Sequence, residues 1–381
     1  MAKAARKKDD EFEEADPFDP RRNPHLEGHD AAENLVLDAW NSGRFPHAWL
    51  ICGPQGIGKA TFAYRLARFI LSDGGQEGGQ GGSGLFGEEL AVDGLGISQE
   101  GQTAHLVSSG GHPDLRVLTR GMVDASGKPT LTRINVYQTR RVVDFTYQTS
   151  AISPWRVVIV DPADDFNTSS ANAILKALEE PPSRAVFLLI SHSPGGLLPT
   201  IRSRCRKLQL RSLEEGTVSD LVQRYRPDTA SNEAQTLGRL AEGSIGRALS
   251  YQAAGGLELF SDMTALLAHP GNPDMGRVTK LSDRVAMKGR EAAYDALCDL
   301  LDWWFKRLIR GLATDQGPAP ITDADAAALA AFRRIGDVER VMAIRDRAVA
   351  LLGQAQPPAN LDRRQLITAL FTEIQRLTRE A

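Results

Sequence analysis

The fold of this chain is decided by the stretch GPQGIGKAT at residues 53–61. It matches the phosphate-binding loop pattern G-x-x-x-x-G-K-[S/T] at every position except the last, where Ala60 replaces Ser or Thr. In such loops the backbone N–H groups cradle the phosphates, and the lysine, here Lys59, reaches the β- and γ-phosphates. The hydroxyl that Ala60 lacks is the group that ligates Mg²⁺. The stretch therefore indicates a nucleoside-triphosphate-binding protein whose site has lost a metal ligand.

The flanks of the loop favour a phosphate site over a chance glycine turn. The apolar run 47–52 before it is typical of a buried parallel strand. After it, Phe62, Leu66 and Phe69 recur on one face of a helix, whose N-terminus adds positive potential at the loop. The sequence leaves open whether ATP, ADP or neither is bound. The candidate nucleotide-binding residues of the loop are Gly53, Gly56, Gly58, Lys59, Ala60 and Thr61.

Composition limits the class of protein. The chain has 381 residues, a formal net charge of −3 and a pI near 6.2, which favours two or three domains and argues against a bulk-basic nucleic-acid binder. The three cysteines are far apart and form no C-x-x-C pair, so we expect no disulfide framework. We find neither a signal-peptide pattern nor an apolar run of membrane-spanning length, and expect a cytoplasmic protein.

Changes in composition divide the chain into segments. Residues 1–22 run basic and then acidic, which predicts a disordered tail. In 23–212 strand and helix patterns alternate, which predicts an α/β domain with a doubly wound parallel sheet. Within that domain, the glycine-rich segment 73–101 is expected to be a flexible surface insertion. We expect two helical domains after it, at 213–255 and 256–381.

Local patterns place the main elements. We expect helices at 31–40 and 134–147, and a third that is capped by Asn167 or Thr168 and ended by two prolines at 181–182. We expect strands at 112–118, 155–161 and 185–190. Near the C-terminus, the apolar residues that recur at helical spacing fit either a bundle core or a subunit contact; they include Leu297, Leu301, Trp304 and Leu308.

The strand at 155–161 fits the second half of a nucleotide site. It ends at Asp161, in the Walker B position, where an Asp holds Mg²⁺ through water. ATPases of this kind follow that Asp with a Glu that polarises the attacking water, but here Pro162 follows, with neither a carboxylate nor an N–H. Asp164 and Asp165 lie too far along the loop to substitute for it. With the loss at Ala60, two groups of one reaction are missing, so we expect lost or weak hydrolysis.

Arginines alternate in LPTIRSRCR at residues 198–206. One interpretation is a solvated basic turn. The other is that Arg204 is an arginine finger, which supplies positive charge to the γ-phosphate of a neighbour in the transition state. A chain that keeps such a finger without hydrolysing ATP itself would activate an adjacent ATPase.

Taken together, the motifs resemble the delta-prime family of bacterial DNA polymerase III clamp-loader subunits, within the AAA+ proteins. The resemblance covers residues 24–252 by motif and the remainder by helical character. Its specific signatures are LEGH at 26–29, SGRFPHA at 42–48, HPD at 112–114, NAILKALEEPP at 172–182 and IRSRC at 201–205.

The resemblance implies a RecA-like AAA+ domain, a small helical lid and an all-α collar that assembles the loader. It implies that Arg204 is the arginine finger, aimed at the ATP of an adjacent motor subunit. Arg247, in GSIGRAL at 243–249, matches the sensor-2 arginine of the lid, which touches nucleotide within the same chain. The alternative for Arg247 is a surface arginine at the start of a helix. Ser191 matches the place of the sensor-1 polar residue.

The family also implies partners and a function. The chain would assemble the loader and supply its finger in trans while the sliding clamp is loaded on primed DNA. The implied partners are the gamma/tau motor and delta clamp-opening subunits and, through the complex, the clamp and DNA; no membrane is implied. Relatives often carry a four-cysteine zinc module where this chain has 73–101 without cysteine, so we expect no zinc and assign no metal ligands.

Two other functions are less consistent with the sequence. An active gamma/tau-like ATPase would carry Gly-Lys-Thr or Gly-Lys-Ser, Asp-Glu and the cysteine module, and this chain has Gly-Lys-Ala, Asp-Pro and no such module. An unrelated P-loop kinase or repair ATPase is disfavoured by the LEEPP and SRC stretches.

Overall fold

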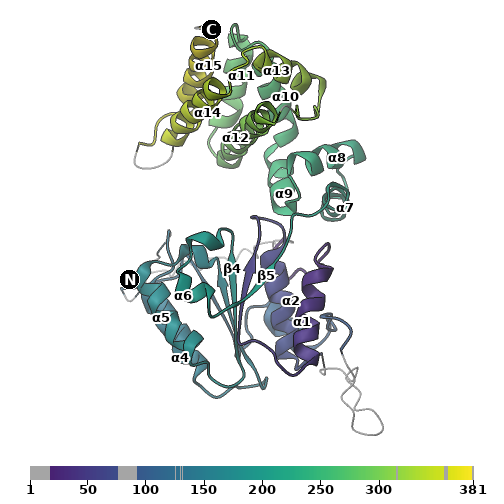
Figure 1. Ribbon diagram of the computed structural model, residues 1–381, viewed down its shortest axis with the longest axis vertical. Coiled ribbons are helices and arrows are strands. Elements are labelled where there is room, and N and C mark those ends of the chain that lie inside the picture. Colours follow the sequence, from purple (N-terminus) through teal and green to yellow (C-terminus); the bar gives the residue numbers. More distant parts are fainter. Residues whose placement is uncertain are drawn as a thin grey trace, which may run out of the picture. The chain divides into compact units, whose positions relative to one another are not determined.

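The computed structural model describes residues 18–75, 92–124, 126–128, 130, 132–314, 316–355 and 359–379. The chain divides into two compact units, one up to Ser212 and one from Leu213 onward (Figure 1). Residues 1–17 of the expected tail and 76–91 of the expected insertion lie outside the described residues.

The first unit is built on a five-stranded parallel sheet with the order β2-β3-β4-β1-β5. The strand β4 is buried along its whole length and pairs with β1, so that Leu50 lies opposite Leu189. The expected parallel α/β sheet is confirmed. The strands are β1 (Ala48–Cys52), β2 (Leu115–Thr119), β3 (Arg156–Asp161), β4 (Ala185–Ser191) and β5 (Arg206–Gln209).

Helices cover both faces of this sheet, because the side chains of each strand alternate between two apolar clusters. In β1, Trp49 and Ile51 join the cluster on one face, and Leu50 and Cys52 join the cluster on the other. The first face is covered by α1 and α2 and the second by α4 and α5 (Figure 1). The helices of this unit are α1 (Asp30–Asn41), α2 (Lys59–Leu71), α3 (Gln102–Ser108), α4 (Val136–Thr146), α5 (Thr168–Glu179) and α6 (Pro199–Arg202).

Most predicted elements lie within three residues of their observed ends, and Asn167 caps α5 by accepting from the backbone N–H of Ser170. One strand was missed. The stretch 198–206, interpreted as a basic turn or a finger loop, forms α6 and the start of β5. Of the four residues of β5, only Leu208 is buried, so the strand has no apolar run by which to recognise it.

Parts of the expected tail and insertion are packed rather than loose. In the tail, the backbone carbonyl of Arg21 accepts a 2.6 Å hydrogen bond from the guanidinium of Arg68 on α2. In the insertion, the side chain of Asn41 bonds the backbone N–H and carbonyl of Val92, at 3.0 and 2.9 Å, and Leu95 is buried in the core. The overall composition of these segments did not predict these contacts, because only a few individual residues make them.

The second unit is entirely helical among its described residues, as expected, and one apolar cluster runs through it from Leu213 to Ile374. The finer division at residue 255 stays a prediction. Leu297, Leu301, Trp304 and Leu308, which recur at helical spacing, are all buried in this core. At these positions the apolar residues therefore form bundle core and not a subunit contact. The helices are α7 (Glu215–Tyr225), α8 (Ser231–Leu240), α9 (Ile245–Ala254), α10 (Gly256–Leu267), α11 (Met275–Ala286), α12 (Glu291–Ala313), α13 (Asp323–Arg333), α14 (Val338–Leu352) and α15 (Arg363–Arg379).

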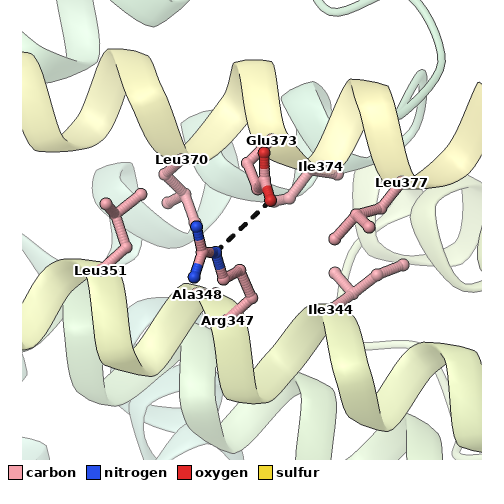
Figure 2. A pocket seen from close by; sticks show the side chains of 8 residues that line it. All are labelled: Ile344, Arg347, Ala348, Leu351, Leu370, Glu373, Ile374 and Leu377. Carbon is pink, nitrogen blue, oxygen red and sulfur yellow. Dashed lines mark ion pairs between the residues drawn. The ribbon is translucent and has the colours of Figure 1, made fainter.

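The last two helices meet along an apolar seam. Figure 2 shows Leu351, Leu370 and Ile374 in this seam, with an ion pair between Arg347 Nε and Glu373 Oε1 at 3.4 Å beside them. Among the described residues, no helix combines the length and apolar character that a membrane span requires.

The HPD signature has a structural role in the first unit. The carboxylate of Asp114, which is 1% exposed, accepts hydrogen bonds from the backbone N–H groups of Ala151, Ile152 and Ser153 at 2.6, 2.8 and 2.9 Å. It thereby fastens the loop between α4 and β3 to the start of β2. Burial raises the pKa of the Asp114 carboxyl, but the three N–H donors more than offset it and leave the pKa below its usual value of 3.8.

We predict that Asp114→Asn lowers the free energy of unfolding by about 1–3 kcal/mol at pH 7, because a neutral amide offers one acceptor oxygen to three donors. Because the folded pKa is lowered, the carboxylate stabilises the protein above pH 3.8 and this contribution is lost as the pH falls through the folded pKa. Urea unfolding at several pH values measures both effects. The control is Asp144→Asn, an exposed position on α4, and an equal loss in the control would contradict the prediction.

Candidate functional site

The loop between β1 and α2 has the backbone conformation of a phosphate cradle. Gly56 and Gly58 have φ of 76° and 101°, a region that residues with a Cβ rarely adopt. Gly53 is needed for space, since a Cβ there would lie 2.6 Å from the carbonyl oxygen of Leu210. The loop that the sequence predicted is therefore formed, and its curvature depends on the glycines of the motif.

Lys59 lies inside this loop. It is 3% exposed, and its ammonium donates to the backbone carbonyls of Gly53, at 2.7 Å, and Pro54. Burial lowers the pKa of Lys59 to about 8, against the opposing effect of the carboxylates of Asp161 and Asp164. The cation is thus held at the centre of the loop, and its charge is balanced by carbonyl dipoles and by acidic groups of neighbouring strand ends.

A buried histidine supports the loop from beneath. His29, directly before α1, is 4% exposed and its Nε2 lies 2.7 Å from the carbonyl oxygen of Ile57. Burial lowers the pKa of His29, which favours the neutral ring. His29 belongs to the LEGH signature, but the sequence did not predict its contact with the loop. Its place beside the predicted start of a helix was the available signal, and its partner is 28 residues away in the chain.

Asp161 lies at the end of β3, within electrostatic reach of Lys59. Burial raises the pKa of Asp161, while the cations of Lys59 and Arg120 oppose that rise. Pro162 follows it, so the chain offers no carboxylate at the next position.

The two acidic residues further along this loop are occupied elsewhere. Asp164 accepts hydrogen bonds from the Ser191 hydroxyl at 2.9 Å and from the backbone N–H groups of His192 and Ser193 at 2.7 and 3.2 Å. Asp165 pairs with Arg120 at 3.3 Å. Asp164 therefore holds the end of β4 in place, which agrees with the expectation that it does not replace the missing glutamate.

Two polar residues lie at the end of β4, and the sensor-1 role of Ser191 stays a prediction. The hydroxyl of Ser191, assigned to the sensor-1 place, is buried and donates to Asp164. The next residue, His192, has a buried Nδ1 without a hydrogen-bond partner among the described residues. Burial and the nearby Lys59 cation lower the pKa of His192. His192 is thus the polar side chain at this strand end that sequence reasoning missed, although it directly follows the predicted strand.

The side chains after Lys59 offer little to a metal. Ala60 is half-buried and packs against the apolar cluster that contains Phe62. Thr61 is half-buried at the next position, about 100° further round α2. In the part of the chain that the structure describes, no three His, Cys, Asp or Glu side chains gather in a way that could hold a metal ion. Ala60 therefore does not supply the usual ligand for a nucleotide-bound metal, and nucleotide binding by the loop stays a prediction.

Arg204 follows α6 and is partly exposed. Its guanidinium makes an ion pair with Glu179, the last residue of α5, at 2.7 Å and donates to the Thr200 carbonyl at 3.0 Å. Its side chain keeps 34% of its surface exposed. The arginine is therefore oriented by its own unit and still accessible from outside.

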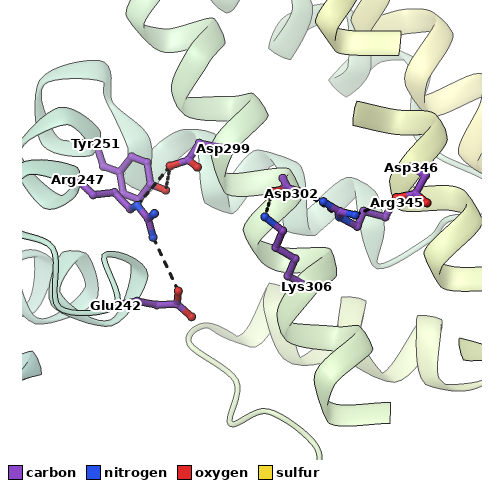
Figure 3. Close-up of polar contacts among 8 residues, drawn as sticks. All are labelled: Glu242, Arg247, Tyr251, Asp299, Asp302, Lys306, Arg345 and Asp346. Atoms are coloured by element: carbon purple, nitrogen blue, oxygen red, sulfur yellow. Dashed lines mark hydrogen bonds and ion pairs between the residues drawn. The ribbon is translucent and has the colours of Figure 1, made fainter. Parts of the chain in front are cut away.

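Arg247 belongs to the second unit, so the structure does not join it to the loop residues. It lies at the start of α9, where its guanidinium approaches Glu242 and Asp299 at 3.8 and 3.5 Å (Figure 3). Asp299 also accepts a 2.6 Å hydrogen bond from the hydroxyl of Tyr251. Within its own unit Arg247 thus links α9 to α12, and its contact with nucleotide stays a prediction.

Comparison with known proteins identifies relatives of this chain. Residues 28–214 match the family model described as "DNA polymerase III, delta subunit". DNA polymerase III subunit delta' of Pseudomonas aeruginosa is 36% identical over 200 residues, which cover 52% of this chain and 53% of that protein. Subunit delta' of Escherichia coli is 27% identical over 90% of this chain and 92% of its own length.

A gamma/tau subunit is also related. DNA polymerase III subunit gamma/tau of Mycobacterium bovis is 31% identical over 50% of this chain and 28% of its own length. The chain spans about half the length of the Pseudomonas aeruginosa relative.

We predict that His29→Ala lowers the free energy of unfolding by about 1–3 kcal/mol, because the carbonyl of Ile57 loses its buried partner. The folded pKa of His29 is lowered below 6.5, so its contribution is present at neutral pH and is lost as the pH falls below 6.5. Chemical unfolding at pH 7.5 and 5.5 measures this, with the exposed His25→Ala as the control. If His29→Ala unfolds with the same free energy as the wild type, the supporting role of this histidine is refuted.

Proposed function

Because the chain belongs to the delta-prime family of DNA polymerase III subunits, we propose that it assembles the clamp loader and activates a neighbouring ATPase. It turns over little or no ATP itself. The observation that carries the proposal is the pairing of an oriented, accessible Arg204 with a nucleotide site that lacks two reactive groups. In this view the first unit presents Arg204 to the γ-phosphate of ATP bound to a gamma/tau motor subunit.

The position of Arg204 supports this role. Its ion pair with Glu179 has both partners partly exposed, so the pair is worth about 1 kcal/mol or less. A phosphate with several negative charges in a water-poor interface attracts a guanidinium more strongly. Glu179 therefore orients the side chain of Arg204, and breaking this ion pair to contact a phosphate costs little free energy.

The intact part of the nucleotide site supports an alternative, an active ATPase of the gamma/tau kind. Lys59 and its glycines are present, and gamma/tau proteins are among the relatives. Ala60 and Pro162 weigh against it, because the Mg²⁺ ligand and the water-polarising base act in the same step. Asp164 does not stand in for the base, since it is bonded to the end of β4.

We predict that Arg204→Ala reduces ATP turnover in the reconstituted loader on the order of 10³-fold at the site it serves. The loader is assembled with motor and clamp-opening subunits, sliding clamp and primed DNA, and phosphate release is measured. Arg202→Ala is the matched control, two residues earlier and exposed, and should leave turnover within twofold of wild type, on the order of surface substitutions. Unchanged turnover in Arg204→Ala would refute the finger assignment.

We further predict that the purified chain alone shows no ATP turnover above a Lys59→Ala control, while the mixture with motor subunits does. Steady turnover by the chain alone, abolished by Lys59→Ala, would overturn the non-motor assignment and favour the gamma/tau-like alternative.

A further inference from the structure

The nucleotide site of this chain is unusual in where its positive charge comes from. In P-loop sites a Mg²⁺ ion, held by the hydroxyl after the lysine and by the Walker B aspartate, neutralises much of the charge on the phosphates. Here the hydroxyl position is Ala60, whose methyl group packs toward the apolar cluster beneath α2. No rearrangement of this side chain can supply an oxygen to a metal.

Two cations of the protein itself lie near the Walker B aspartate. Lys59 is buried in the loop, and Arg120 directly follows Thr119, the residue of β2 that lies opposite Asp161 in the sheet. Arg120 also pairs with Asp165 at 3.3 Å and keeps 57% of its side chain exposed. Two positive residues therefore lie at the same edge of the sheet as the aspartate whose charge a metal would otherwise offset.

From this arrangement we infer that the site binds the phosphates of ADP or ATP without Mg²⁺, with Lys59 and Arg120 in the charge-balancing role of the metal. The inference rests on the proposed function, in which the site holds nucleotide without hydrolysing it. Magnesium is required for phosphoryl transfer but not for a backbone cradle and a lysine to hold a diphosphate.

The inference reverses the expected role of Asp161. With Mg²⁺ between them, an aspartate and a phosphate attract through the metal, and loss of the aspartate weakens binding. Without the metal, the carboxylate and the phosphates are like charges at short range, and they repel. The effect of Asp161→Asn on affinity therefore has opposite signs in the two cases.

The test is the equilibrium dissociation constant of a fluorescent ADP analogue for the purified full chain, measured in EDTA and in millimolar Mg²⁺. We expect the two constants to agree within about twofold, and Asp161→Asn to tighten binding about threefold or more. A gain of tenfold or more on adding Mg²⁺, or weaker binding by Asp161→Asn, would overturn the inference. Circular dichroism confirms that each variant is folded.

An isosteric pair of variants tests the cause. Ala60→Thr introduces the missing hydroxyl, and Ala60→Val adds the same volume without it. We expect Mg²⁺ to tighten ADP binding by Ala60→Thr and to leave Ala60→Val unchanged. Equal Mg²⁺ responses of the two variants would contradict the assignment to the hydroxyl.

The result is separable from the finger assignment. Binding of the ADP analogue at this site should be abolished by Lys59→Ala. If no such binding is found in EDTA or in Mg²⁺, this inference fails. The role of Arg204 is then judged independently by turnover in the reconstituted loader, since that measurement follows ATP bound to another subunit.

Discussion

The buried ammonium of Lys59 is the interaction on which the organisation of the nucleotide site depends. A charge that is 3% exposed is tolerated only with close partners, and the loop supplies two backbone carbonyls. The carboxylate of Asp161, at the end of β3, adds a favourable electrostatic effect on the cation. To bring those carbonyls inward the loop must curl, and curling requires glycine at positive φ. Glycine is also required where the loop meets the sheet, because Gly53 lies too close to the backbone of Leu210 to leave room for a side chain.

Carboxylates perform the corresponding task at the ends of the strands. Asp114 gathers three backbone N–H groups of the loop before β3, and Asp164 gathers a hydroxyl and two N–H groups at the end of β4. Loops at the edge of a parallel sheet leave backbone donors without ladder partners, and a buried carboxylate satisfies several at once. Acidic residues in this unit therefore need not be catalytic. Asp164 holds the end of β4 beside the candidate site, and Asp114 holds the opposite edge of the sheet, where β2 begins.

The distribution of intact and missing groups gives the site a consistent chemical character. The parts that hold phosphate, the glycine loop and its lysine, are formed, whereas the parts that serve hydrolysis, at Ala60 and Pro162, are absent. Arg204 lies between α6 and β5, where it is oriented by Glu179 and partly exposed. This distribution is the basis of the proposal that the chain contributes to a neighbour's reaction by position and charge.

The sequence by itself determined the strand, loop and helix around Lys59, the parallel sheet and the helical second half, because each of these follows from local glycines or from apolar periodicity. It also identified the missing groups at Ala60 and Pro162. Only the tertiary structure decided the rest. The strand β5 has a single buried residue and forms because β1 offers an open edge. The hydrogen bonds of His29 and Asp114 join residues that are 28 and at least 37 positions apart. At the end of β4, Nδ1 of His192 has no hydrogen-bond partner among the described residues. Such contacts depend on which elements meet in space, which no local pattern encodes.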